Sequence, residues 1–192
     1  NDSKLFRSRA ECEKDGYQPD EYSHWLKGLW KTYTASSNIL DRPSNIVLSR
    51  DGSMYLTITG IEYDDVALPL YEGRMINQFD FSEKGWVSGK GRKAIWDPIS
   101  FKNKIIQPQY LMALSKYYGS GTKNSKLIPG LKVGFLAIGS ATNSRSMFAG
   151  LVAGFPAGNS VAVLQCSTMQ RTVTLMAILN SFVYDFSLRN RL

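Results

Sequence analysis

At 192 residues the chain is long enough for one domain, or for one domain with a small extension. Hydrophobic residues make up 43% of it and aromatic residues 12%, which suffices for a buried core and argues against intrinsic disorder. Lys and Arg (23) outnumber Asp and Glu (16), and the net charge of +7 favours a polyanionic partner, nucleic acid first and an anionic membrane surface second, unless it serves solubility alone.

In chain order, apolar residues at helical spacing predict a first helix over residues 20–33, with Asp20 placed to cap it. Residues 44–59 form two alternating runs around an Asp-Gly turn signal and predict a β-hairpin. Residues 66–70 predict a buried strand. The stretch from Glu72 to Phe79 then predicts a tight turn that leads into a short helix.

Residues 82–104 and 117–132 are rich in Gly, Lys and Arg, and predict exposed loops or, for the first, a loose hairpin. Three strand-like runs follow, over residues 132–140, 147–155 and 160–166, and a last helix is predicted over residues 171–189. The chain is therefore expected to have an α+β fold, with mixed twisted sheets of short strands, long basic loops, an N-terminal helix and a C-terminal helix.

The two cysteines, Cys12 and Cys166, stand far apart and match neither a disulfide framework nor a zinc motif, so a reducing, cytoplasmic setting is expected. No apolar run reaches the roughly 18–20 residues that a membrane span needs, and no membrane association is predicted. Both ends look cut, because Leu192 follows an apolar-periodic segment without a capping glycine. We therefore expect a fragment of a larger protein.

Catalytic patterns are weak in this sequence. The single histidine, His24, has no Ser-His-Asp or Cys-His arrangement around it that spacing alone would indicate. Adenine methyltransferases hold the flipped base with an Asn/Asp-Pro-Pro-aromatic loop, and Trp96-Asp97-Pro98-Ile99 has neither the second proline nor the aromatic residue. We expect no catalytic residues and no metal in the chain itself.

Three segments together resemble a known family. Leu70–Asp80 (LYEGRMINQFD) is similar to a block that follows the catalytic domain of large adenine-specific DNA methyltransferases. These include type IIG-like fused restriction–modification enzymes, type ISP enzymes and the BREX and DISARM phage-defence methylases. Gly134–Ser146 (GFLAIGSATNSRS), followed by Gly158–Ser160, resembles a second block, and Leu179–Arg189 (LNSFVYDFSLR) resembles a third. Arg74 stands where the family usually has Lys.

In that family this region is the target recognition domain. The resemblance covers residues 66–189 and implies that the domain over residues 41–192 binds double-stranded DNA. Residues 1–40 are expected to be an N-terminal helical extension. It also implies that a catalytic domain of the same parent chain binds S-adenosylmethionine and methylates adenine at N6. No cofactor is expected in this fragment. Whether the parent also cleaves DNA is left open.

For the first segment two interpretations remain open. Arg74, Asn77 and Gln78 can face DNA, since Arg bonds guanine or phosphate and Asn or Gln bonds adenine. Alternatively Glu72, Arg74 and Asp80 form an internal salt-bridge network, with Gln78 bonded to backbone.

Other expected DNA contacts are Arg145, on phosphate, and the cations of the two basic stretches, although a solvated loop has the same composition. These cations include Lys90, Arg92, Lys93, Lys102, Lys104, Lys123 and Lys126. A protein–protein specificity module of a phage-defence complex is the alternative function.

Overall fold

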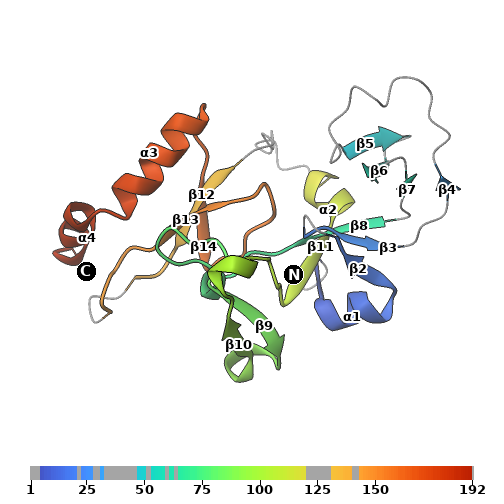
Figure 1. The fold of residues 1–192 in the computed structure, drawn as a ribbon, viewed down its shortest axis with the longest axis horizontal. Helices are drawn as coiled ribbons and strands as arrows, with labels where there is room; N and C mark the ends of the chain where they lie inside the picture. Colours follow the sequence, from blue (N-terminus) through green and yellow to red (C-terminus); the bar gives the residue numbers. More distant parts are fainter. Residues whose placement is uncertain are drawn as a thin grey trace. The chain divides into compact units, whose positions relative to one another are not determined.

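The structure is a computed structural model, and it describes residues 5–20, 23–27, 31–32, 47–50, 53–58, 61–62, 65–119, 131–139 and 143–191 (Figure 1). The chain divides into two compact units. Unit 1 comprises residues 1–69 and 110–126, and unit 2 comprises residues 70–109 and 127–192.

Unit 1 is built on a five-stranded antiparallel sheet. In spatial order its strands are β1 (Phe6–Ser8), β11 (Tyr110–Ala113), β8 (Asp65–Pro69), β3 (Trp25–Lys27) and β2 (Tyr17–Pro19). A second antiparallel sheet has the order β4 (Lys31–Thr32), β7 (Ile61–Glu62), β6 (Ser53–Ile58) and β5 (Val47–Arg50).

Among its described residues, unit 1 also contains two short helices. Helix α1 (Arg9–Lys14) begins at Ser8, whose side chain accepts the Glu11 backbone N–H while the Glu11 side chain accepts that of Ser8. Helix α2 (Leu114–Gly119) follows β11 directly. Part of the second basic stretch, residues 120–130, lies outside the described residues. The core of this unit gathers Cys12, Tyr17, Trp25, Ala67 and Leu111.

The helix predicted over residues 20–33 is wrong. Asp20 and His24 close a tight turn, in which the Asp20 N–H donates to the His24 carbonyl at 2.8 Å and the Asp20 carboxylate accepts the His24 N–H at 2.7 Å. Trp25 then starts β3, which pairs with β2 on one side and β8 on the other. Strand pairing on both sides satisfies the backbone and buries Trp25, and this outweighs the helical spacing of its neighbours.

The predicted hairpin over residues 44–59 is confirmed in its strands, since β5 and β6 pair antiparallel with Arg50 opposite Ser53. The turn residues between them lie outside the described residues. The predicted buried strand from Val66 is confirmed as β8, which is the central strand of the five. Its continuous burial is expected of a strand covered on both sides.

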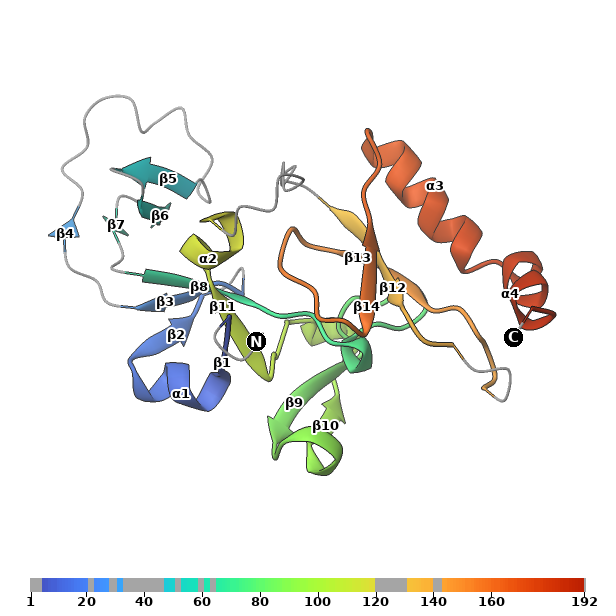
Figure 2. The same cartoon turned by 180° about the vertical axis from the view of Figure 1, so that it is seen from behind.

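Unit 2 contains a three-stranded antiparallel sheet, a two-stranded hairpin and two helices. The sheet has the order β13 (Ala149–Val152), β12 (Lys132–Leu136) and β14 (Val161–Leu164), and the hairpin pairs β9 (Lys84–Ser88) with β10 (Ile95–Pro98). Helix α3 (Met169–Leu179) lies against β12 and β13, and α4 (Phe182–Arg189) follows it (Figures 1 and 2). The chain combines antiparallel sheets with helices and has more strand than helix, so the α+β class is confirmed. Mixed sheets were expected, but the strands of these sheets pair antiparallel.

The single helix predicted over residues 171–189 is also wrong, because the chain leaves the helix between α3 and α4. Ser181 has extended backbone angles and its hydroxyl accepts the Tyr184 N–H, so it caps α4 as a new helix. Only part of the predicted apolar face is buried. Leu179 packs in the core, whereas Phe182 is 81% exposed and Phe186 69% exposed.

The basic stretch over residues 82–104 is confirmed as a hairpin with a tight tip. Gly89 has a positive φ of 78°, and a Cβ there would lie 2.4 Å from the Lys93 carbonyl oxygen. Only glycine allows this turn without strain. The carbonyl of Gly89 accepts bonds from the Trp86 indole and the Gln109 amide, at 3.0 and 3.1 Å. The hairpin is therefore held at its tip as well as along its strands.

Candidate functional site

Unit 2 contains a cavity of about 640 Å³. One wall is the segment that starts at Leu70, and the others come from the start of β9, the end of β12, the approach to β13 and the loop before β14. The lining residues are Glu72, Gly73, Arg74, Ile76, Asn77, Glu83, Lys84, Leu136, Ser144, Phe148 and Ser160. Two acidic and two basic side chains thus share this cavity with apolar walls.

Tyr71 anchors the wall that carries the first motif. Its backbone N–H donates to the Pro156 carbonyl and its own carbonyl accepts the Gly158 N–H, both at 2.9 Å. Its hydroxyl accepts the Ala153 N–H at 3.2 Å, and the side chain is 1% exposed. The 3₁₀ turn Gly73–Met75 follows, and Gly73 donates to the Ser160 hydroxyl at 2.9 Å. The predicted turn is therefore present, but no α-helix follows it.

Glu72 is half-buried beside the cavity. No donor among the residues that the structure describes reaches its Oε1, although this atom is shielded from solvent. Burial raises the pKa of Glu72 to about 7, against the opposing effects of the Arg74 charge and the Gln109 backbone N–H. The carboxyl group therefore changes its protonation state near neutral pH, which is uncommon for a glutamate and typical of a functional site.

Arg74 is exposed and points to the hairpin. Its Nη1 donates to the Ala94 carbonyl at 3.1 Å, and its guanidinium lies 5.9 Å from the centre of the Trp96 ring. Among the ion pairs of the described residues, Asp80 pairs with Lys104 and not with Arg74. In place of the expected salt-bridge network among Glu72, Arg74 and Asp80, Asp80 therefore pairs with Lys104, and Arg74 remains accessible.

Asn77 and Asp80 close a tight turn through two backbone bonds of 2.9 and 3.0 Å. The Asn77 side-chain oxygen accepts the Gln78 N–H at 2.7 Å, and the Gln78 amide donates to the Asn180 carbonyl at 3.4 Å. Phe79 has a φ of +58° and is 54% exposed at the turn. Asn77 and Gln78 thus have internal partners, and Phe79 is the side chain that the turn presents to solvent.

Lys104 is mostly enclosed. Its ammonium donates to the Asp80 carboxylate at 2.6 Å and to the Ser82 carbonyl at 2.8 Å. This pair closes the base of the hairpin onto the motif segment. Its charge is matched internally, unlike that of an exposed loop cation.

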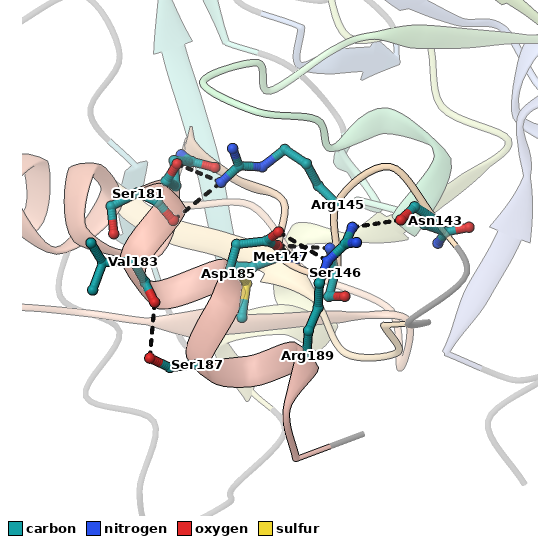
Figure 3. Close-up of polar contacts among 10 residues, drawn as sticks. Asn143, Arg145, Ser146, Met147, Ser181, Val183, Asp185, Ser187 and Arg189 are labelled. Carbon is teal, nitrogen blue, oxygen red and sulfur yellow. Dashed lines mark hydrogen bonds and ion pairs between the residues drawn. The ribbon is translucent and has the colours of Figure 1, made fainter.

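Arg145 is buried, with 9% of its surface exposed, and its guanidinium bonds the carbonyls of Asn180 and Ser181 at 2.6 and 3.3 Å (Figure 3). It also lies 4.8 Å from the centre of the Phe182 ring. The predicted phosphate ligand thus holds the junction between α3 and α4.

Asp185 joins the second and third motifs. Its carboxylate accepts the N–H groups of Ser146 and Met147 at 2.7 and 2.9 Å, and Arg189 Nε at 3.2 Å (Figure 3). Burial alone would raise the pKa of Asp185, but these two N–H groups and the charges of Arg145 and Arg189 outweigh it and hold the pKa below its usual range. Asp185 is therefore an ionised structural residue.

The exposed cations lie on two turns of the hairpin region. The 3₁₀ turn Gly91–Lys93 carries Arg92 and Lys93 beside Lys90, and the turn Phe101–Asn103 carries Lys102; all four cations are exposed. Lys123 and Lys126 lie outside the described residues. The structure thus places Lys90, Arg92 and Lys93 together at the hairpin tip and Lys102 in a separate turn after β10, while Lys104 and Arg145 serve internal contacts.

Glu83, Lys84, Phe148 and Ser160 also line the cavity; of these, only Lys84 is among the cations of the basic stretches that were expected to contact DNA. They come from three separate parts of the chain, and no spacing pattern connects them. Within the described part of the chain, no group of three His, Cys, Asp or Glu side chains is placed to hold a metal ion, and no helix is long and apolar enough to cross a membrane.

The chain matches no protein-family model, no curated protein and no solved structure.

Proposed function

We propose that this chain is the target recognition domain of an adenine-N6 DNA methyltransferase or restriction–modification enzyme, and that it binds double-stranded DNA through unit 2. S-adenosylmethionine would be bound by the catalytic domain of the parent, which acts in the cytoplasm. We expect the 192 residues alone neither to bind S-adenosylmethionine nor to methylate DNA. Tritium transfer from the methyl donor to DNA by the purified chain would contradict that.

The observation that carries the proposal is the way the three motifs meet. Arg145 bonds Asn180 and Ser181, Asp185 bonds Ser146 and Met147, and Gln78 bonds Asn180. Segments far apart in the sequence thus form one connected framework in unit 2. The three motifs resemble those of a DNA-recognition family, and they also pack together in one unit. This supports an architecture shared with that family over a chance match of the motifs.

The exposed hairpin supports DNA as the ligand. A two-stranded β-ribbon fits the major groove of B-DNA. Its glycines let the backbone approach the DNA closely, and the Lys and Arg side chains between them can contact phosphates. Lys90, Arg92 and Lys93 lie at the tip of this ribbon, and Arg74 lies behind it on Trp96. We therefore assign phosphate contacts to the tip, with Arg74 as the nearest candidate for a base or phosphate.

Salt dependence tests the proposal. We expect the affinity for a labelled duplex, measured by fluorescence anisotropy, to fall steeply with salt, with a log–log slope of roughly 0.9 for each phosphate contact. The triple variant Lys90→Ala/Arg92→Ala/Lys93→Ala should lower that slope by about 2 to 3. Lys14→Ala/Arg171→Ala/Arg191→Ala removes the same charge from other exposed positions and should leave the slope nearly unchanged.

Failure to bind any duplex at low salt would overturn the proposal. An unchanged slope in the hairpin variant would instead move the DNA contacts to another surface.

A protein-binding module remains the second candidate, because α4 exposes three large apolar side chains: Phe182, Val183 and Phe186. Exposed apolar clusters of this kind commonly mark protein interfaces. If this function holds, Phe182→Ser/Phe186→Ser should abolish association with a partner subunit of a phage-defence complex in a pull-down of purified components. DNA binding would then be absent, or present without salt dependence.

A further inference from the structure

We infer that the cavity of unit 2 binds a single unstacked nucleotide, whose base donates an amino N–H to Glu72 and whose phosphate lies against Arg74 and Lys84. This inference rests on the proposed function, since duplex DNA is the source of the nucleotide. It concerns a site distinct from the hairpin tip, where only phosphates are contacted.

The size and lining of the cavity suit one nucleotide. Ligand sites commonly enclose about 300–1,000 Å³ and combine apolar walls with a few polar groups. This cavity measures about 640 Å³, with Leu136, Ile76 and Phe148 as apolar walls. An aromatic side chain such as Phe148 offers a surface on which any base can stack.

Glu72 defines the edge of the base. Buried polar atoms almost always have a hydrogen-bond partner, yet Glu72 Oε1 is shielded from solvent and has none among the described residues. Because Glu72 lines the cavity, a rotation of its carboxyl group toward the cavity would bring this oxygen to a ligand N–H. Adenine, cytosine and guanine carry exocyclic amino groups that can donate to a carboxylate, whereas thymine carries none.

The cavity offers both carboxylates and cations to a molecule that carries N–H donors and a phosphate. Arg74 and Lys84 line the cavity together with Glu72 and Glu83. A guanidinium has five N–H donors, and the bond from Arg74 to Ala94 uses one of them. The excess positive charge of the chain favours an anion over a cationic ligand.

The protonation of Glu72 gives the inference a distinct signature. An N–H donor binds the ionised carboxylate better than the neutral acid, so binding should strengthen as pH rises through about 7, by up to tenfold per pH unit below that value. The charged and polar groups around Glu72 are Arg74, the Gln109 N–H, Glu83 and Lys84.

The experiment compares three duplexes by fluorescence anisotropy at one salt concentration: fully paired, with one bulged adenine, and with one bulged purine that lacks the amino group. The wild-type chain should bind the bulged adenine about tenfold or more tighter than the other two at pH 8, as expected for one charged hydrogen bond, and this preference should shrink at pH 6. Glu72→Leu should abolish the preference, and Glu72→Gln should make it independent of pH. Glu13→Gln removes an equal charge from α1 and should change nothing.

Equal binding of all three duplexes overturns the inference while leaving the proposed function intact, and an adenine preference that Glu72→Leu retains also overturns it. If Glu72→Leu does not fold, the pH dependence of Glu72→Gln decides, and a preference that still varies with pH counts against Glu72. If no duplex binds, the proposed function fails and this inference fails with it.

Discussion

At the scale of single residues, unit 2 separates polar side chains that hold the fold from those that remain accessible. Arg145 and Asp185 are buried, and both form hydrogen bonds to backbone groups. Arg74 is exposed and contacts a carbonyl and a ring. Glu72 lies between these cases, because it is half-buried with one oxygen unbonded. These differences lead to one prediction for Arg74 and one for Glu72.

Arg74→Ala should cost at most about 1 kcal/mol of unfolding free energy, since an exposed side chain with one backbone bond and a cation–π contact contributes little. It should weaken DNA binding by about 1–3 kcal/mol for the preferred sequence if the guanidinium bonds a base. If it bonds phosphate, all sequences should weaken alike. Chemical denaturation and anisotropy on the same sample measure both. A loss of several kcal/mol in stability would show that Arg74 is structural.

The raised pKa of Glu72 predicts a pH dependence of stability. The folded chain holds the Glu72 proton up to about pH 7, whereas the unfolded chain releases it near the ordinary value of about 4.5. The folded state binds more protons in this interval, so the unfolding free energy should fall as pH rises from about 5 to 7 and then level off. Denaturation midpoints at several pH values measure this.

Glu72→Gln is the matched variant, because its amide stays neutral at every pH and should flatten this part of the profile. Asp185 acts in the opposite direction: its lowered pKa gives stability that is present at neutral pH and is lost on acidification. A profile for Glu72→Gln that parallels the wild type between pH 5 and 7 would assign the dependence to another group.

At the scale of elements, the interruption between α3 and α4 decides how the helices attach to the sheet. Asn180 follows the last residue of α3, and its side-chain amide accepts the Ala149 N–H and donates to the Ala149 carbonyl, at 3.1 and 2.7 Å. Asn180 thereby gives Ala149, the first residue of β13, both bonds that a residue of a neighbouring strand would give it. Ser181 then caps α4, which lets Asp185 reach the backbone before β13.

Asp185→Ala should therefore destabilise unit 2 by about 2–4 kcal/mol, because it leaves two buried N–H groups without an acceptor. Asp97, on β10, is exposed, and Asp97→Ala should change stability by no more than about 0.5 kcal/mol. Thermal unfolding of both variants tests this. Similar, small effects for the two would show that water replaces the Asp185 contacts.

At the scale of the whole molecule, the chain passes from unit 1 to unit 2, back and across again, so each unit is assembled from two separate segments. Each unit has its own core, with Cys12 and Trp25 in unit 1 and the motif framework in unit 2. Compact units with separate cores can unfold separately, in which case a single unfolding free energy does not describe the chain.

Cys12 provides a probe for unit 1. It is 1% exposed, and burial raises the pKa of its thiol to about 11, so little reactive thiolate forms in the folded state. In a Cys166→Ser background, the rate of alkylation of Cys12 should report the opening of unit 1. Asp185→Ala should leave this rate unchanged, whereas Trp25→Ala should raise it. Equal acceleration by both substitutions would mean that the two units unfold as one.

Local patterns by themselves determined much of this protein. Alternating runs and an Asp-Gly signal specified β5 and β6, and short apolar runs specified β8, β12, β13 and β14, because these signals act between neighbouring residues. The basic hairpin was also evident from its composition, since glycines and charges mark an exposed turn. Local patterns did not decide whether Arg74 faces DNA or belongs to an internal salt-bridge network.

Tertiary structure decided the rest, since it depends on partners far away in the chain. Trp25 lies in a strand because β3 pairs with β8 on one side and β2 on the other. The helix predicted over residues 171–189 is interrupted at Asn180, whose side chain bonds the backbone of Ala149. Lys104 belongs to the same basic stretch as Lys90, and Arg145 was likewise expected to contact DNA, yet Lys104 bonds Asp80 and Arg145 bonds the Asn180 carbonyl. The pKa of Glu72 likewise follows from burial, a property that arises only when distant segments pack together.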